Sequence, residues 1–262
     1  MNFSSIIGII SAIAVFFTAL ITSTSSHDIF LNPHGILIVI GGTAAASIIC
    51  FPLPTLFKLF KVFFQRIIGK NATQHQVVIA EIVDLARGAR EDALYLQNRL
   101  PLIKTDFLKE AIDIMVQGGI SEHALDIILK KRTMTHYKRY EEDAAIFKTI
   151  GKFPPAFGLL GTTLGMIGML QNLGSPDSYK MLGPSMAVGL TATLYGIAIT
   201  NFIFIPVGES LSKFNKEDEV VREMVVDGIK LLRKKEHPIV VEEHLKSFLL
   251  PGERKKLAKL AA

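Results

Sequence analysis

Four long stretches of this chain contain no Asp, Glu, Lys or Arg and consist mainly of apolar residues. An apolar helix of about 20 residues is long enough to cross the hydrocarbon core of a bilayer. Each stretch therefore predicts one transmembrane helix. We expect the four spans at about residues 3–21, 36–53, 153–170 and 182–207.

Between the second and third spans, apolar residues recur at helical spacing, first in 77–89 and again in 107–115. Gly118 and Gly119 then predict a helix stop, and Ser121 is a suitable N-cap for the next helix. The polar residues after that point lead into the third span, which indicates one long helix. The chain after the fourth span is basic and also predicts helix, without a separate folded domain.

Charge predicts how the spans are oriented. All but one of the 29 Lys and Arg residues lie in 58–152 and 213–259, and only Lys180 lies in a short connecting loop. Positive charge marks the cytoplasmic side of a membrane, so both termini and the middle segment are expected there. This orientation accounts for the net charge of +5 better than nucleic-acid binding does. The first apolar stretch lacks a basic leader, so we expect a retained helix rather than a cleaved signal.

These patterns together predict an all-α membrane protein with four transmembrane helices. A helical cytoplasmic domain separates spans two and three, and a helical C-terminal tail follows span four. The expected divisions are a first transmembrane hairpin (1–54), a cytoplasmic domain (55–150), a channel-forming hairpin (151–207) and a cytoplasmic tail (208–262).

Candidate chemistry is sparse. Cys50 is the only cysteine, which excludes a disulfide framework and a cysteine metal cluster. No nucleophile–base or metal-ligand spacing occurs, so we expect neither an enzyme nor a cofactor. No Asp, Glu, Lys, Arg or His lies inside the third and fourth spans. Because ion carriers in membranes normally need an ionisable group, any ion path here requires a partner that supplies the carboxylate.

Small and hydroxyl residues form one stripe on each of these two spans. A packing face is one interpretation, since such residues let helices approach closely. The other is a polar crevice, in which threonine hydroxyls contact a partly dehydrated cation or a chain of water. The stripes are Pro155, Gly158, Thr162, Gly165 and Met169 on the third span, and Gly189, Thr193, Gly196 and Thr200 on the fourth.

Two further features each allow two interpretations. Pro155 opens the third span and Pro206 ends the fourth, either as ordinary helix punctuation or as hinges that let the cytoplasmic part tilt. Arg87, Arg90 and Glu91, together with the following Asp, form either a solvated face or a binding patch.

The apolar spans resemble those of MotA/PomA-type flagellar stator proteins. The resemblance rests on 153–165 (FPPAFGLLGTTLG), on 186–196 (MAVGLTATLYG) with the Phe-Ile-Pro of 204–206, and on 36–43 (ILIVIGGT). It covers nearly the whole chain, in order and with similar loop lengths.

The resemblance implies a function as well as a fold. Several copies, expected to be five, would surround the single-span helices of a MotB/PomB-type partner whose Asp takes up H+ or Na+. Ion flux would then turn the ring against a FliG-type rotor switch protein, in a bacterial cytoplasmic (inner) membrane. By resemblance, Pro155 and Pro206 match functional prolines, and Thr162 and Thr193 match positions that help bind sodium.

Four positions depart from the family pattern: Asn32, Ala89, Gln97 and Asn98. The rotor-contact helix of the family carries a basic pair and, further on, an acidic residue. Here Ala89 and Arg90 fall on the basic pair, and Gln97 and Asn98 fall on the acidic end. The rotor contact is therefore assigned to Arg90 and Gln97, with Arg87 or Glu91 as substitutes. At Asn32 many sodium-type members have Asp, so the choice between H+ and Na+ stays open.

Two rival functions remain at this point. An ExbB/TolQ-like energiser of another envelope machine is the nearer one, because it would share the ion-driven mechanism. Rotor binding would distinguish the energiser, which has no flagellar switch partner. A membrane scaffold without ion flux is the second rival, and it should still work without the Thr162 and Thr193 hydroxyls, whereas a motor should change its ion dependence.

Overall fold

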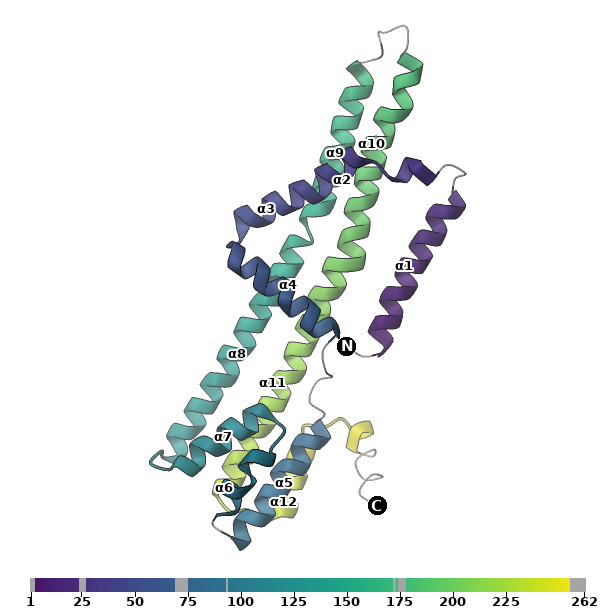
Figure 1. Cartoon of the computed structure of the whole chain (residues 1–262). Helices are drawn as coiled ribbons and strands as arrows, with labels where there is room; N and C mark the ends of the chain where they lie inside the picture. The colour runs from purple at the N-terminus through teal and green to yellow at the C-terminus, as the bar shows by residue number, and fades with distance from the viewer. Residues whose placement is uncertain are drawn as a thin grey trace. The chain divides into compact units, whose positions relative to one another are not determined.

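The computed structural model describes residues 3–23, 27–68, 75–92, 94–171, 173 and 178–254, and these residues form helices and turns with no strand (Figure 1). In chain order the elements are α1 (Phe3–Ser23), the 3-10 helix η1 (His27–Phe30), α2 (Pro33–Ile36), the π-helix η2 (Leu37–Gly41), α3 (Gly42–Cys50), α4 (Leu53–Ile68), α5 (His75–Glu91), α6 (Tyr95–Arg99), the 3-10 helix η3 (Leu100–Leu102), α7 (Asp106–Gln117), α8 (Glu122–Ile150), α9 (Phe153–Gln171), α10 (Ser178–Ile199), the π-helix η4 (Thr200–Phe204), α11 (Ile205–Arg233) and α12 (Pro238–Lys246).

The chain folds into two compact units, and neither is continuous in sequence. The first unit combines residues 1–70 with 142–212, and the second combines 71–141 with 213–262. The long helices α8 and α11 each contribute residues to both units.

Three helical segments among the described residues are long and apolar enough to cross a bilayer. They are Pro33–Cys50, Glu122–Gln171 and Leu182–Arg233, and each overlaps a predicted span. The second predicted span differs in its bounds, because its helix begins at Pro33 and ends at Cys50, before an extended Phe51, rather than at residue 53. A shorter apolar helix, Ile10–Ser23, lies within α1. The all-helical fold and three apolar segments agree with the sequence analysis, whereas a fourth crossing by α1 stays a prediction.

The second predicted span begins at a side-chain cap. The Asn32 side-chain oxygen accepts hydrogen bonds from the backbone nitrogens of His34 and Gly35, each at 3.1 Å. This arrangement satisfies donors that the first turn of a helix leaves unpaired. Asn32 therefore has a clear structural role, which the sequence analysis missed when it treated this position only as a marker of ion type.

The fourth predicted span continues into α11 without ending at Pro206. Proline has no N–H to bond the carbonyl of Phe202, and its ring crowds the preceding turn. The turn directly before it, η4, is wound as a π-helix (Thr200–Phe204). The wider winding accommodates the ring while the helix goes on, so Pro206 marks a local irregularity inside a long helix rather than a helix end.

The second unit has the larger hydrophobic core. Helix α7 ends where predicted, because Gly118 and Gly119 have φ values of 73° and 76°, which side chains rarely adopt. Ser121 then accepts a hydrogen bond from the Ala124 nitrogen at 3.2 Å and starts α8. The C-terminal helices complete this core rather than forming a solvated tail, as its fully buried side chains show: Ile82, Leu108, Ile112, Leu129, Met224, Ile229 and Leu245.

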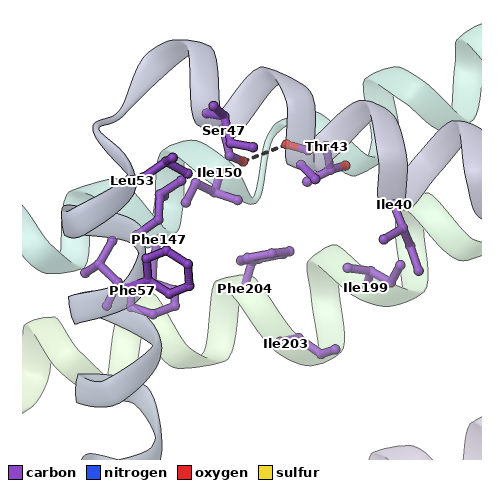
Figure 2. A pocket seen from close by; sticks show the side chains of 14 residues that line it. Ile40, Thr43, Ser47, Leu53, Phe57, Phe147, Ile150, Ile199, Ile203 and Phe204 are labelled. Atoms are coloured by element: carbon purple, nitrogen blue, oxygen red, sulfur yellow. Dashed lines mark hydrogen bonds between the residues drawn. The ribbon is translucent and has the colours of Figure 1, made fainter.

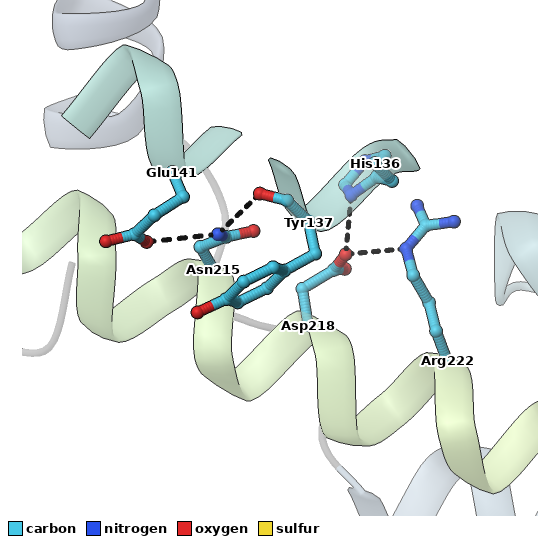
Figure 3. Close-up of polar contacts among 6 residues, drawn as sticks. All are labelled: His136, Tyr137, Glu141, Asn215, Asp218 and Arg222. Carbon is cyan, nitrogen blue, oxygen red and sulfur yellow. Dashed lines mark hydrogen bonds and ion pairs between the residues drawn. The ribbon is translucent and has the colours of Figure 1, made fainter. Parts of the chain in front are cut away.

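Polar side chains join α8 to α11 within the second unit (Figure 3). The Asn215 side-chain nitrogen donates to the Tyr137 carbonyl at 3.0 Å, and Asp218 accepts from the Arg222 guanidinium at 2.7 Å. The same Asp218 oxygen also lies 3.2 Å from His136 Nδ1. Nearby, burial and the neighbouring Glu223 and Glu141 carboxylates raise the pKa of Glu219.

Candidate functional site

The two predicted stripes face each other in the α9–α10 hairpin, whose helices lie side by side in the first unit (Figure 1). A methyl group added at Gly196 would lie 2.4 Å from the Pro154 carbonyl oxygen. One added at Gly165 would lie 2.6 Å from the Ser185 carbonyl oxygen. Only glycine permits backbones this close, so both residues belong to the helix contact, as the packing interpretation predicts.

The hydroxyls of Thr162 and Thr193 meet in the middle of this contact. Their oxygen atoms are 2.5 Å apart. The Thr193 hydroxyl also lies 3.1 Å from the Gly158 carbonyl, and the Thr162 hydroxyl lies 3.0 Å from the Gly189 carbonyl. Both threonines are half-buried, so in a single chain their hydroxyls are satisfied by each other and by the backbone.

Thr200 has a different environment from the other stripe residues. Its hydroxyl donates to the Gly151 carbonyl at 2.8 Å, and the residue is 6% exposed. Pro155 lies four residues after Gly151 and has no N–H to offer this carbonyl. The fourth span thus supplies the hydrogen bond that the first turn of α9 lacks. Thr200 is a contact of the α8–α9 junction, and the structure separates it from the Thr162–Thr193 pair.

Pro155 lies in the first turn of α9, as the sequence predicts. The helices α8 and α9 are separated only by a turn at Gly151 and the following Lys, so the expected single rod is interrupted at this point. The two prolines are placed alike, because each is the second or third residue of a helix that follows an irregular turn.

The predicted rotor patch occupies the corner between α5 and α6 in the second unit. A methyl group on Gly88 would lie 2.2 Å from the Tyr95 ring, so the two helices fold back closely here. Asp84 accepts from the Tyr95 hydroxyl at 3.2 Å and pairs with Arg99 at 3.0 Å. Burial, and then the Asp84 carboxylate, raise the pKa of Tyr95. This frame presents exposed residues at the corner: Arg87, Arg90, Glu91, Gln97 and Asn98.

Tyr195 is a contact residue that the sequence analysis missed. Its hydroxyl donates to the Phe30 carbonyl and accepts from the Asn32 nitrogen, the latter at 3.1 Å. It therefore ties the start of the second predicted span to α10. A tyrosine within an apolar span is a signal in itself, because a buried tyrosine hydroxyl usually needs a partner.

Comparison with known proteins shows which family this chain belongs to. Residues 100–224 match the MotA/TolQ/ExbB proton channel family. Motility protein A of Bacillus subtilis is 30% identical over 264 residues, which cover 99% of this chain and 95% of that protein. The chain belongs to this family. Chemotaxis protein PomA of Vibrio alginolyticus is 29% identical over 257 residues, which cover 97% of this chain and 98% of that protein.

Solved structures of family members have the same fold. The flagellar MotAB stator complex from Bacillus subtilis contains a chain with a TM-score of 0.84 and 29% identity, covering 97% of this chain and 98% of that one. A chain of C. jejuni MotAB has a TM-score of 0.85 at 23% identity, covering 96% and 97%. Family membership and the apolar helices establish a membrane protein. The motility protein A and PomA relatives, together with the MotAB stator structure from Bacillus subtilis, support the expected flagellar stator subunit over the ExbB/TolQ-like energiser.

Proposed function

We propose that this chain is the channel-forming stator subunit of a bacterial flagellar motor, which couples H+ or Na+ flux to torque. It lies in the cytoplasmic membrane with four spans and both termini inside. Several copies, five by resemblance, surround the single-span helices of a MotB/PomB-type partner. The second unit, between spans two and three and after span four, acts on the rotor switch protein.

One observation carries this proposal. The chain aligns over nearly its whole length with motility protein A and PomA, yet its third and fourth spans contain no Asp, Glu, Lys, Arg or His. A protein that moves ions through a membrane normally holds an acidic group there. The moving ion must therefore be handed over by a partner, and the related chain from Bacillus subtilis was solved within such an assembly, the MotAB stator complex.

The Thr162–Thr193 pair supports a place for the ion path. Threonine hydroxyls can act as donor and acceptor, so a pair of them can exchange its mutual hydrogen bond for contacts to water or a cation. In the assembled ring, we propose that this face of α9 and α10 contacts the ion delivered by the partner. Gly165 and Gly196 keep the two helices close enough for the pair to form.

The decisive experiment measures swimming of the source bacterium after deletion of this gene and its restoration. Swimming speed is recorded against sodium concentration, with and without a protonophore. Loss of motility on deletion and its recovery with the intact gene are expected. Normal motility of the deletion strain, in a bacterium with no second stator set, would overturn the proposal.

The same assay identifies the ion. Sodium-dependent speed that resists the protonophore assigns Na+, and the reverse assigns H+. The variants Thr162→Val and Thr193→Val remove only hydroxyls, so they should shift the ion dependence while the protein still reaches the membrane. A scaffold without ion flux would work unchanged in both variants.

A further inference from the structure

An apolar pocket of about 540 Å³ lies in the first unit, apart from the α9–α10 contact (Figure 2). Its walls come from five parts of one chain: the end of η2, α3, α4, the end of α8, and the α10–η4 segment. Pockets of about 300–1,000 Å³ are typical of small-ligand sites. A space lined by five helical segments of the same chain is more than a flat surface patch.

The wall of this pocket offers almost nothing to a polar ligand. Of the lining residues, only Thr43 and Ser47 carry a polar side chain. The Ser47 hydroxyl donates to the Thr43 carbonyl at 2.7 Å, and the Thr43 hydroxyl oxygen is buried without a hydrogen-bond partner, so one hydroxyl is all that these two side chains leave unpaired. Ordered water needs two to four polar partners, which this wall does not provide. The chemistry of the pocket therefore suits a hydrocarbon.

Several apolar residues that line the pocket are also exposed on the outer surface of the membrane helices, so the pocket opens onto that surface. Ile40 and Ile48, on the segment Pro33–Cys50, are 54% and 51% exposed and also line the pocket. Ile203, on the segment Leu182–Arg233, is 46% exposed and lines it from another side. An acyl chain can therefore enter from the bilayer without crossing a polar surface.

Two lysines of α4 are close in sequence to residues that line the pocket. They follow the apolar segment Pro33–Cys50. Lys58 lies between the lining residues Phe57 and Leu59, and although it pairs with Asp143 its side chain is 51% exposed. One turn further along α4, Lys61 is exposed. Lysines at this level can contact phosphate while their stems cover apolar surface.

We propose that this pocket binds an acyl chain of a membrane phospholipid, whose phosphate is held by the lysines of α4. The site is distinct from the ion path and from the rotor corner. A phospholipid bound there fills the space between α3, α4 and η4 and so supports the irregular turn before Pro206.

The chain contains no tryptophan, so one introduced tryptophan is a clean fluorescent reporter. We would place it in the purified full-length assembly as Phe57→Trp, in the pocket wall, and as Phe17→Trp on α1, away from the pocket. These residues are 71% and 57% exposed, so both reporters can meet lipid and only the pocket distinguishes them. The probe is phosphatidylglycerol brominated on its acyl chains, added in detergent. Bromine quenches tryptophan only at short range.

Saturable quenching is expected for Phe57→Trp at a low ratio of lipid to protein, with recovery when excess unbrominated phosphatidylglycerol is added. Phe17→Trp should be quenched only in proportion to the lipid present. Adding Ala44→Phe, which fills the pocket, should remove the saturable component. Adding Ala45→Phe, on the next residue and outside the wall, should leave it intact.

Two results would overturn the proposal. The two reporters could behave alike, or saturable quenching could survive Ala44→Phe. If the mass of the assembly also changes in the second case, the pocket is assigned to a second copy of the chain. Because the reporter experiment needs no pocket-filling variant, a folding failure of Ala44→Phe would leave the test decisive.

Discussion

The Thr200 hydroxyl donates to the Gly151 carbonyl at 2.8 Å and takes the place of the N–H that Pro155 lacks. A backbone carbonyl left without a donor in an apolar region costs about 1–3 kcal/mol. The fourth span therefore supports the start of the third, and a proline that weakens the helix is tolerated there.

Thr200→Val is expected to destabilise the protein by about 1–3 kcal/mol, because it leaves this carbonyl unpaired. For a chain of this size that corresponds to a fall in melting temperature of roughly 2–4 °C per kcal/mol, measured in detergent. Adding Pro155→Ala restores an N–H at the position that can bond Gly151. The double variant should recover stability but not motility, provided that Pro155 is needed as a hinge. An unchanged melting temperature for Thr200→Val would refute the bond.

Gly196→Ala should disrupt the α9–α10 hairpin. The new methyl group would lie 2.4 Å from the Pro154 carbonyl oxygen, so backbone must move, at a cost of about 1–3 kcal/mol. Gly168→Ala on α9 is the matched control, since its methyl group would be 3.8 Å from the nearest atom, the Ser185 hydroxyl. The higher helix propensity of alanine favours both variants by about 1 kcal/mol. Motility and melting temperature should fall only for Gly196→Ala, and equal behaviour of the two would contradict close packing.

Pro206→Ala restores an N–H that can bond the Phe202 carbonyl, so the π-helical turn before it should become regular. We expect normal insertion and loss of swimming, because the irregular turn is the proposed hinge. Pro184→Ala, at an exposed position inside α10, controls for the general effect of removing a proline from a span. Full motility of Pro206→Ala at normal protein levels would argue against the hinge.

The stripes on the third and fourth spans are predictable because small residues at spacings of three and four have few other uses. The role of Thr200 is not predictable in this way. It shares the spacing of Thr193 and Gly196, and only the fold brings it to a carbonyl in another helix. The burial of Met224 and Leu245 could not be predicted either, because the sequence of an amphipathic helix does not show which other helices cover its apolar face. At Asn32 the signal was available, because Asn before Pro-His-Gly is a strong helix cap.

Stability of the second unit should depend on Asp126. Burial opposes its ionisation, but hydrogen bonds from Lys130 and Lys230 outweigh burial and lower the pKa of Asp126 below its ordinary value of 3.8. The carboxylate therefore contributes stability above about pH 3.8, and this contribution is lost as the pH falls through the lowered pKa. For Lys230, burial opposes the charge but the acidic partners raise the pKa, so its contribution is lost only above 10.5.

Asp126→Asn is accordingly expected to lower stability at neutral pH by about 1 kcal/mol, the scale of a partly exposed ion pair. Melting temperature is measured from pH 7 downward. The gap between variant and wild type should close as the pH approaches the lowered pKa. Glu122→Gln, at an exposed position in the first turn of the same helix, should change little. A gap that does not depend on pH would rule out this linkage.

Arg90→Glu should impair rotation if Arg90 provides the rotor contact. The residue is exposed at the α5–α6 corner, so reversal of its charge leaves the core untouched. Lys109→Glu, an exposed charge reversal on α7 in the same unit, is the control. Motor speed under load is the measurement, with protein level checked by immunoblot. Equal speeds of both variants and wild type would show that the rotor contact lies on another surface.

The buried contact between Gly88 and Tyr95 has a consequence for how such a corner evolves. The path of the backbone there is set by Gly88, the Tyr95 ring and the Asp84–Arg99 pair. None of these is among the exposed residues that were predicted to contact the rotor. Mutation can therefore exchange arginine for alanine, or glutamate for glutamine, on the outside without rebuilding what holds it. If this corner is the rotor contact, its charge can change to match a changed rotor surface while the backbone shape of the corner is kept.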